Sequence, residues 1–225
     1  MAATRGQRIR SRLLHRYRAV RERARVQAQR GWVDRPISVV PLIFGEPAVL
    51  VRDSFNRNDN ALSLGNAETG QAWTEIGAAA LAIGIVSGRA VGDGAAGDDG
   101  AYVETDRADV DISADVQCSE PGISYILLRY SAADALIIVG ADNSAANNFA
   151  IWRNNAGWSL IGNWASDPGT TVHQLRVVAK GSSIQLFVAG VLRISVTETF
   201  NQTETKHRCW LRATSALDNF IVKAA

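Results

Sequence analysis

The amino-acid sequence predicts a mainly β protein in which an antiparallel β-sandwich follows a basic α-helix and an extended arm. From Arg52 onward, short runs rich in β-branched and aromatic residues are separated by Gly, Asn, Asp and Ser, with no amphipathic helix between them. Residues 32–51 hold three of the five prolines. Residues 4–30 hold ten arginines and no proline, a composition that favours a helix.

The first segment, residues 1–31, is predicted to be an amphipathic helix that ends at Gly31. Its apolar side chains recur every three or four residues and form one narrow stripe, while arginines cover most of the remaining surface. Isolated helices are marginally stable, and arginines four residues apart repel each other, so this helix needs a partner to stay ordered. The residues expected to dock it are Ile9, Leu13, Tyr17 and Val20 of the stripe, with Arg8, Arg12, Arg16 and Arg23.

Residues 32–51 are predicted to be an extended arm, because each proline removes a backbone donor and drives the preceding residue towards extended geometry. The arm is also apolar, whereas a solvated linker is rich in Gly, Ser or charged residues. We therefore expect it to lie against a protein surface, either of this chain or of another subunit. Its docking residues are expected to be Ile37, Val39, Leu42 and Phe44.

The remaining residues, 52–225, are predicted to form the sandwich. Within residues 109–118, apolar residues from Val110 to Val116 alternate with polar ones, as in a strand with one buried face. Between residues 171 and 197, turns at 180–183 and 189–190 separate three β-rich runs and predict a meander. The predicted strands are 80–86, 101–105, 109–118, 122–130, 134–140, 147–153, 158–164, 171–180, 182–188, 190–197, 207–213 and 217–223.

Charge is divided unevenly along the chain. Ten arginines and the single acid Glu22 give residues 1–30 a net charge of +9, so the total of +2 leaves −7 for the other residues. The basic segment lacks the apolar stretch of a signal peptide, and no run approaches the roughly 20 apolar residues that span a bilayer. We expect a protein that neither inserts into a membrane nor uses the general secretory route.

No catalytic pattern is recognisable, and we expect a protein without enzymatic activity. The acids between Glu104 and Asp111 do not make the Glu-x-Asp-x-Glu strand that brings two carboxylates to about 5–5.5 Å in retaining glycosidases. None of the three histidines has a local arrangement typical of a catalytic triad. Cys118 and Cys209 stand far apart without a CxxC motif, which favours buried free thiols over a zinc site or a disulfide.

Four stretches of the predicted sandwich resemble one known kind of domain. They are RDSFNRNDNALSLGNAETGQAWTEIG (52–77), SGRAV (87–91), FNQTETKHRCWL (200–211) and ALDNFIV (216–222). Over residues 52–223 the chain resembles the concanavalin A-like or laminin-G-like sandwich domain carried by minor tail proteins of phages that infect actinobacteria. The resemblance implies a jelly-roll sandwich in a tail protein of the virion, assembled in the host cytoplasm beside other tail proteins. By analogy with phage fibre and tip proteins, it also implies a homo-oligomer such as a trimer.

The resemblance further implies that the first and last strands pair. Such pairing would let three aromatic side chains meet in the core, namely Phe55, Trp73 and Phe220. It would also offer Arg57 a carboxylate partner in Asp53, Asp59 or Asp218. An alternative use of these acids is a structural calcium site at Asp53 and Asp218, and no other cofactor is expected.

Residues 147–164, NNFAIWRNNAGWSLIGNW, hold three of the six tryptophans close to asparagines and an arginine. Flat aromatic faces stack on sugar rings while neighbouring polar groups hydrogen-bond to them, which makes Trp152, Arg153, Trp158 and Trp164 candidate glycan ligands. The alternative is that these tryptophans are core or interface residues. A two-residue turn at Asn155 and Ala156 would set Arg153 opposite Trp158 and point Trp152 to the other face, so at least one tryptophan would be core.

Three functions fit these observations. In the first, a structural virion protein of the tail tip or fibre docks through its helix and arm and displays the sandwich, which binds host cell-surface glycan. In the second, the arginine-rich helix binds nucleic acid, since phosphate neutralisation needs only positive charge. A phosphate binder needs neither an apolar stripe nor an apolar arm, and this favours the first function. The third, a carbohydrate-active enzyme of the concanavalin A-like fold, lacks the expected carboxylates.

Overall fold

The computed structural model describes residues 46–225, except residues 62, 77–82, 93–98, 133–134 and 145–147. The predicted docking helix and residues 32–45 of the arm lie outside the described residues. The same is true of every residue expected to dock a partner, from Arg8 to Phe44. The described residues belong to the second of the two units into which the chain divides, Gly45–Ala225.

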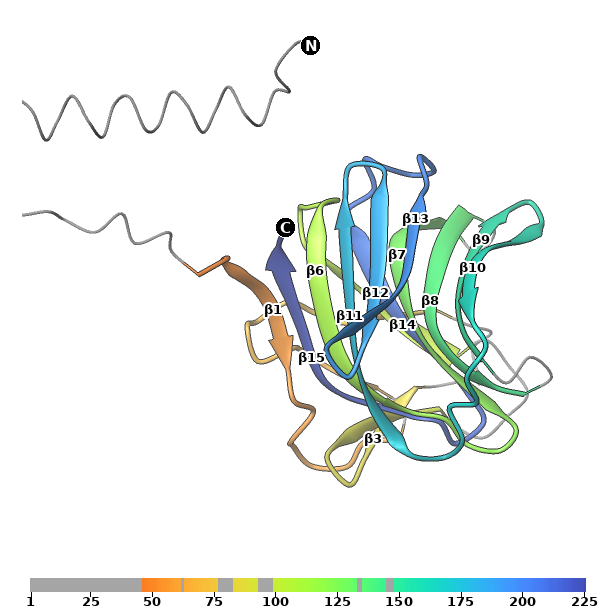
Figure 1. The fold of residues 1–225 in the computed structure, drawn as a ribbon. Helices are drawn as coiled ribbons and strands as arrows, with labels where there is room; N and C mark the ends of the chain where they lie inside the picture. Colours follow the sequence, from red (N-terminus) through yellow and green to blue (C-terminus); the bar gives the residue numbers. More distant parts are fainter. Residues whose placement is uncertain (1–45, 62, 77–82, 93–98, 133–134, 145–147) are drawn as a thin grey trace, which may run out of the picture. The chain divides into compact units, whose positions relative to one another are not determined.

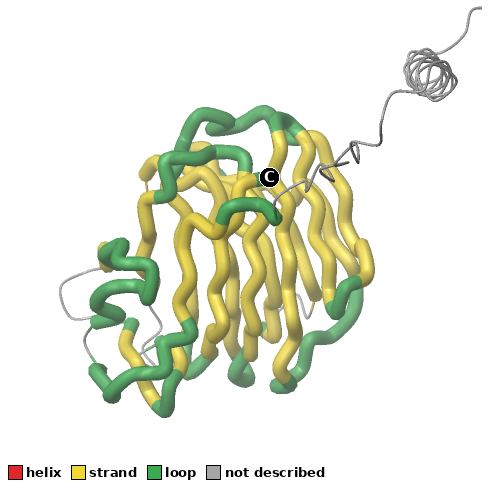
Figure 2. Tube along the Cα trace, turned by 90° about the vertical axis from the view of Figure 1, so that its left-hand side faces the viewer, coloured by secondary structure: helices red, strands yellow, loops and turns green. Residues whose placement is uncertain are grey.

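Two antiparallel β-sheets pack face to face, as the sequence predicts (Figure 1). The eight-stranded sheet has the order β13-β12-β11-β6-β15-β4-β3, and β1 also pairs with β15. The seven-stranded sheet has the order β10-β9-β8-β7-β14-β5-β2. The loops gather at the two ends of the strands, and no helix is present among the described residues (Figure 2). It follows that none of these residues belongs to a helix that could cross a membrane.

The strand bounds are as follows. The eight-stranded sheet contains β1 (Val49–Asp53), β3 (Gly84–Val86), β4 (Arg89–Val91), β6 (Val110–Gln117), β11 (Val172–Lys180), β12 (Ser183–Val188), β13 (Val191–Thr197) and β15 (Ala216–Ala224). The seven-stranded sheet contains β2 (Thr74–Ile76), β5 (Asp99–Glu104), β7 (Gly122–Ala132), β8 (Ala135–Asn143), β9 (Asn148–Asn155), β10 (Trp158–Trp164) and β14 (Lys206–Arg212).

Each of the twelve predicted strands corresponds to an observed one, and the meander of β11, β12 and β13 is confirmed. Three short strands, β1, β2 and β4, escaped prediction because three to five residues carry too little alternation to be recognised. Strand β1 begins at Val49, within the segment predicted to be the arm, and pairs with the last strand so that Asp53 lies opposite Phe220. Figure 1 shows β1 beside β15 at the edge of the sandwich.

The main core fills the space between the sheets. Strand β6 shows how it is built, because its residues alternate strictly between buried and half-buried positions from Val110 to Gln117. The buried residues of β6 pack with those of β7, β8 and β9 from the opposite sheet, such as Ile126, Val139 and Ile151. The predicted alternation in residues 109–118 is therefore confirmed. Both cysteines are free and buried, Cys118 after β6 and Cys209 within β14.

The cluster expected from the pairing of the first and last strands is also present. The rings of Phe55 and Trp73 are 5.9 Å apart, and those of Trp73 and Phe220 are 5.2 Å apart. The carboxylate of Asp53 is fully buried next to them and accepts two hydrogen bonds from Arg57, at 2.7 and 3.0 Å. It also accepts 2.8 Å bonds from the indole of Trp73 and the backbone of Phe55. These donors and the paired charge make burial of the acid tolerable.

Candidate functional site

The outer face of the seven-stranded sheet carries a second apolar cluster, separate from the core. Side chains alternate along β14, so Cys209 and Leu211 belong to the core between the sheets while Trp210 lies on the outer face. Six aromatic residues gather here, and we call this surface the aromatic face: Tyr102, Tyr125, Tyr130, Trp152, Trp158 and Trp210.

The rings of the aromatic face contact one another across the strands. Trp158 stacks on Trp210 with centroids 5.9 Å apart and an angle of 26° between their planes, and the ring of Tyr125 also lies 5.9 Å from that of Trp210. Tyr102 and Tyr130 form a second stack at 5.7 Å. The guanidinium of Arg208 bridges the two groups, because it lies over both Tyr130 and Trp210, at 5.6 and 6.0 Å. The rings of this one surface come from five strands of the sheet.

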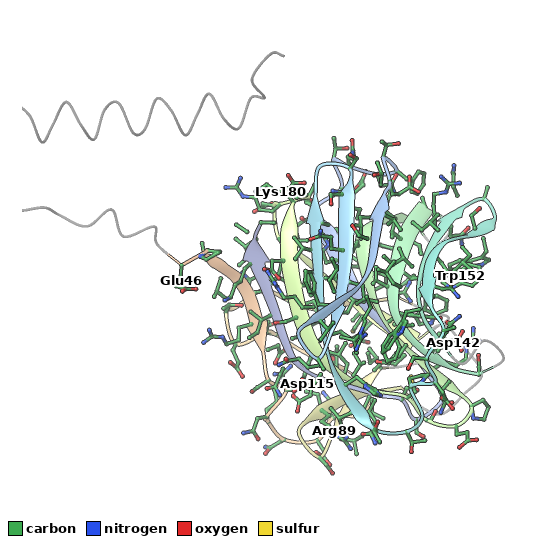
Figure 3. All side chains as sticks on the ribbon, in the orientation of Figure 1. Glu46, Arg89, Asp115, Asp142, Trp152 and Lys180 are labelled. Carbon is green, nitrogen blue, oxygen red and sulfur yellow. The ribbon has the colours of Figure 1, made fainter. Side chains whose placement is uncertain are left out.

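A shallow hollow of about 230 Å³ opens in this face. Trp158 is 49% exposed and forms its most accessible wall. Figure 3 shows Trp152 and Asp142 on the same side of the molecule, apart from Asp115 and Arg89 of the other sheet. The residues that line the hollow are Ile123, Tyr125, Ile138, Asp142, Trp152, Trp158, Trp210 and Arg212.

The polar groups of the hollow differ in how well they are satisfied. Asp142 accepts hydrogen bonds from the hydroxyl of Tyr125 at 3.1 Å, from the backbone of Ser144 at 2.9 Å and from the hydroxyl of Ser144. Burial and the adjacent charge of Asp142 raise the pKa of Tyr125, so this phenol stays protonated and donates. The indole nitrogen of Trp210, in contrast, is buried, and among the described residues it has no hydrogen-bond acceptor. Trp210 therefore contributes apolar ring surface to the hollow, since its nitrogen is closed off from solvent.

Gly140 makes the close packing of this face feasible. A Cβ at this position would lie 2.9 Å from the Cα of Tyr125 and 3.0 Å from its ring carbon Cδ1. Only glycine leaves room for the Tyr125 ring to lie over β8, where its hydroxyl reaches Asp142.

The four residues predicted to bind glycan divide between the two faces of this sheet. Trp152 and Trp158 belong to the aromatic face. Trp164 packs instead on the main core, with its ring 5.2 Å from Phe149, and Arg153 pairs with the buried Glu198 at 3.4 Å.

The predicted register of this hairpin was wrong by one residue. Residues 155–157 form the turn, so Trp158 lies opposite Asn154 and shares a face with Trp152, while Arg153 lies opposite Ser159. Because the turn contains three residues and not the expected two, the side chains of β10 that follow it lie on the opposite face from the one predicted relative to β9. Sequence reasoning also missed Tyr102, Tyr125, Tyr130 and Trp210. The only local signal was the alternation of cationic and aromatic residues with apolar ones in KHRCWLR (206–212).

The acids between Glu104 and Asp111, which lack the catalytic pattern, make ion pairs and hydrogen bonds within the sandwich. Asp111 forms a 2.6 Å ion pair with Arg176 on the eight-stranded sheet. Asp109 pairs with the buried Arg129 at 3.4 Å and accepts the backbone N–H of Gly181 at 2.8 Å. Hydrogen bonds from the backbone N–H groups of residues 105 and 106 hold Glu104.

The histidines contact backbone carbonyls. His173 bonds with the carbonyl of Pro168 at 2.7 Å, and His207 with that of Arg107 at 2.9 Å. The third, His15, lies outside the described residues.

The two carboxylates considered for calcium, Asp53 and Asp218, make different contacts. Both oxygens of Asp53 accept hydrogen bonds from Arg57, whose positive charge occupies the place that a cation would take. Asp218 accepts the backbone N–H of Asn219, and burial together with the nearby charge of Asp115 raises its pKa. In the part of the chain that the structure describes, no group of three or more His, Cys, Asp or Glu side chains could hold a metal ion.

A larger hollow of about 620 Å³ lies on the eight-stranded sheet, over the ends of β4, β6 and β15. Its most polar residues satisfy one another, because Arg89 donates to Gln117 at 2.6 Å and Gln117 donates to the carbonyl of Thr170 at 2.9 Å. No stacked aromatic pair is found among its lining residues. The aromatic face is accordingly the better candidate for ligand binding.

Comparisons with known proteins agree on the fold. No family model matches the chain, and no curated protein sequence matches it. Among solved structures, the carbohydrate-binding module CBM66 from Bacillus subtilis has a TM-score of 0.53 at 13% identity, with 68% of this chain and 95% of that one covered. Domain 4 of the extracellular arabinanase AbnA from Geobacillus stearothermophilus, solved with arabinotriose, has a TM-score of 0.53 at 14% identity, with 80% and 94% covered.

A protein of unknown function with a galectin-like fold, also from Bacillus subtilis, has a TM-score of 0.55 at 9% identity, with 80% of this chain and 97% of that one covered. At such low identities these likenesses concern the fold alone. The chain therefore contains a β-sandwich of the kind found in carbohydrate-binding modules and galectin-like proteins.

Proposed function

We propose that the sandwich is a carbohydrate-binding domain that holds a glycan against the aromatic face. The observation that carries the proposal is the stack of Trp158, Trp210 and Tyr125 around a hollow in which Trp158 is 49% exposed. Sugar rings present flat C–H surfaces that pack on such aromatic rings, and polar side chains beside the rings hydrogen-bond to the sugar hydroxyls. The carbohydrate-binding fold of the similar structures supports the same class of ligand.

Binding without catalysis fits the polar groups better than hydrolysis does. A retaining glycosidase needs two carboxylates about 5–5.5 Å apart, one of them ready to attack. Asp142 is the one carboxylate among the residues that line the hollow, and three hydrogen-bond donors already occupy it. It is therefore placed to hold Tyr125 in position and not to attack a sugar.

We extend the proposal to the setting that the sequence resemblance implies. The protein is a minor component of a phage tail, with the basic helix and apolar arm docked into other tail proteins and the sandwich displayed towards host cell-wall polysaccharide. Within the virion it forms a homo-oligomer.

The decisive experiment compares two variants of the full chain for binding to purified host cell-wall polysaccharide. Trp158→Ala removes an exposed wall of the hollow, and Leu192→Ala removes an apolar side chain of similar exposure from β13, on the other sheet. We expect a loss of affinity of about tenfold in the first, equivalent to about 1.4 kcal/mol, and no change in the second. Equal binding by both variants would show that the aromatic face is not the binding surface.

The docking role needs a separate test, in which residues 1–45 are deleted. This deletion leaves β1 intact, because the strand begins at Val49. We expect the shortened protein to stay folded and to be missing from assembled tails. Normal incorporation would refute docking by the helix and arm. Tight, salt-sensitive DNA binding by the full chain, lost on deletion, would favour the nucleic-acid alternative.

A further inference from the structure

We propose that the aromatic face selects sugar residues that carry a methyl group, either the methyl of a 6-deoxyhexose or that of an N-acetyl substituent. This inference rests on the proposed function, since it names the ligand class of the same site. Two observations support it. The side chains of the hollow are sorted into a polar end and an apolar end, and the apolar end continues as exposed surface onto the edge strand β10.

The register of the strands places the polar residues of the hollow together. Arg212 of β14 lies opposite Ile123 of β7, and Ile123 in turn lies opposite Asp142 of β8. Facing residues of neighbouring strands share a face of the sheet, so these three side chains form one row across the hollow. Tyr125 directs its hydroxyl towards this row and donates to Asp142 at 3.1 Å. The hydroxyls of a bound sugar meet hydrogen-bonding side chains at this end.

The apolar end lies four residues from Asp142 along β8. Here Ile138 lies opposite Trp152 of β9, and Trp152 lies opposite Leu160 of β10. Ile138 is 3% exposed and forms the floor of the hollow, whereas Leu160 is 46% exposed beside it. Neither Ile138 nor Leu160 carries a hydrogen-bonding group in its side chain.

Gly140 stands midway between the two ends on β8, and the ring of Tyr125 lies against the strand there. A sugar ring that stacks on the aromatic face at this point directs one edge to the polar end and the opposite edge to Ile138. Arg208 of β14 belongs to the same row as Ile138, but it is buried and does not line the hollow. The edge of the sugar next to Ile138 therefore meets apolar side chains.

Methyl and hydroxyl groups have opposite effects on binding at such an apolar end. A hydroxyl that leaves water without gaining a hydrogen-bond partner weakens binding. A methyl group strengthens binding when it leaves water, because apolar surface is removed from the solvent. Both effects favour a sugar that presents a methyl group to Ile138.

The exposed part of the apolar end points to the same ligand. Trp158 and Leu160 are about half exposed, and they share one face of β10. This strand lies at the edge of its sheet, and its sequence, WSLIGNW, contains no charged residue. An exposed apolar patch of this kind marks an interaction site. A glycan with methyl groups on its successive residues can cover the patch beyond the hollow.

The test measures binding of matched methyl glycosides to the full chain by titration of its tryptophan fluorescence. The hollow of about 230 Å³ is smaller than the roughly 300–1,000 Å³ of sites that enclose a drug-sized molecule, so single sugar residues suffice as probes. Methyl α-L-rhamnoside is compared with methyl α-L-mannoside, and methyl α-L-fucoside with methyl α-L-galactoside. The members of each pair differ only in one hydroxyl on the terminal carbon. A third pair, methyl N-acetyl-β-D-glucosaminide and methyl β-D-glucoside, exchanges an acetamido group for a hydroxyl.

Two variants of Ile138 are matched to each other. Threonine and valine have nearly the same shape, but only threonine offers a hydroxyl to the ligand, so Ile138→Thr and Ile138→Val separate polarity from size. Leu192→Thr on β13 of the other sheet is the distant control. Urea unfolding of each variant verifies that it is folded.

We expect at least one methyl-bearing probe to bind about tenfold more tightly than its counterpart, equivalent to about 1.4 kcal/mol. Ile138→Thr should lower this preference by about threefold or more relative to Ile138→Val, because its hydroxyl supplies a partner to the competing sugar. Leu192→Thr should leave the preference unchanged. A preference within the first two pairs identifies the methyl of a 6-deoxyhexose, and a preference within the third identifies an N-acetyl group.

The inference is wrong if the wild-type protein prefers none of the methyl-bearing probes, a result that requires no variant to fold. It is also wrong if Ile138→Thr changes the preference no more than Ile138→Val does. If Trp158→Ala still weakens polysaccharide binding in either case, the proposed glycan site stands and only its selection of methyl groups fails.

Discussion

His207 should make the sandwich sensitive to mild acid. Its ring is fully buried and points into the sandwich from β14, where Nε2 donates to the carbonyl of Arg107 at 2.9 Å and Nδ1 has no partner among the residues that the structure describes. Burial, helped by the positive charge of Arg129, lowers the pKa of His207 to about 4 against the opposing effect of the Arg107 carbonyl. A second proton on this ring would have no acceptor.

The sign and size of the effect follow from linkage. Between pH 6.5 and about 4 the unfolded chain binds a proton at His207 that the folded chain does not, so the free energy of unfolding falls as the pH falls. The contribution is fully present above pH 6.5. A pKa difference of this size corresponds to about 3 kcal/mol lost by pH 4, a large part of the 5–15 kcal/mol typical of a folded domain.

The assay is urea unfolding of the full chain at several pH values between 7.5 and 4, together with His207→Gln. Glutamine can donate to the Arg107 carbonyl but does not titrate, so the variant should lose about 3 kcal/mol less than the wild type over this range. His173→Gln, which changes a half-buried histidine at the start of β11, is the control. Parallel pH profiles for the wild type and His207→Gln would refute the reasoning.

Three further predictions concern stability and reactivity. Phe220→Ala should cost about 3–5 kcal/mol in urea unfolding, because the ring is fully buried against Trp73, whereas Phe187→Ala on the outer side of β12 should cost less than half as much. Cys118 and Cys209 should not react with a thiol reagent at pH 8 until the protein unfolds, since burial raises their pKa values to about 12 and about 11; rapid modification of the native protein would contradict this. Calcium and chelators should leave the melting temperature unchanged, because Arg57 already neutralises Asp53, and a calcium-dependent rise would restore the metal site expected for Asp53 and Asp218.

Local pattern was enough to predict most strands. The alternation in β6 and the turns around Gly181 and Gly190 depend on neighbouring residues alone, and the structure confirms them. The cluster of Phe55, Trp73 and Phe220 was predictable from the family resemblance, since it requires only that the first and last strands pair. Strands β1, β2 and β4 were missed because their pairing partners, and not their own residues, place them in the sheets.

The candidate site was only partly predictable. Trp152 and Trp158 were recognised as ligands by their chemistry, but the face that each occupies depends on a single turn residue, Gly157. Trp210 lies 52 positions from Trp158 in the sequence and nevertheless stacks on it. No pattern within either segment indicates that contact.

The sequence by itself determined the fold class, the order of most strands and the kinds of side chain available for stacking and charge. Periodicity and turn residues act over a few positions, so they can be read without the rest of the chain. Only the tertiary structure decided which aromatic residues share a surface, because the order of strands in a sheet brings together residues that are distant along the chain. It also decided that Asp142 already accepts three hydrogen bonds while the indole N–H of Trp210 finds no acceptor among the described residues, since hydrogen-bond satisfaction depends on neighbours in space.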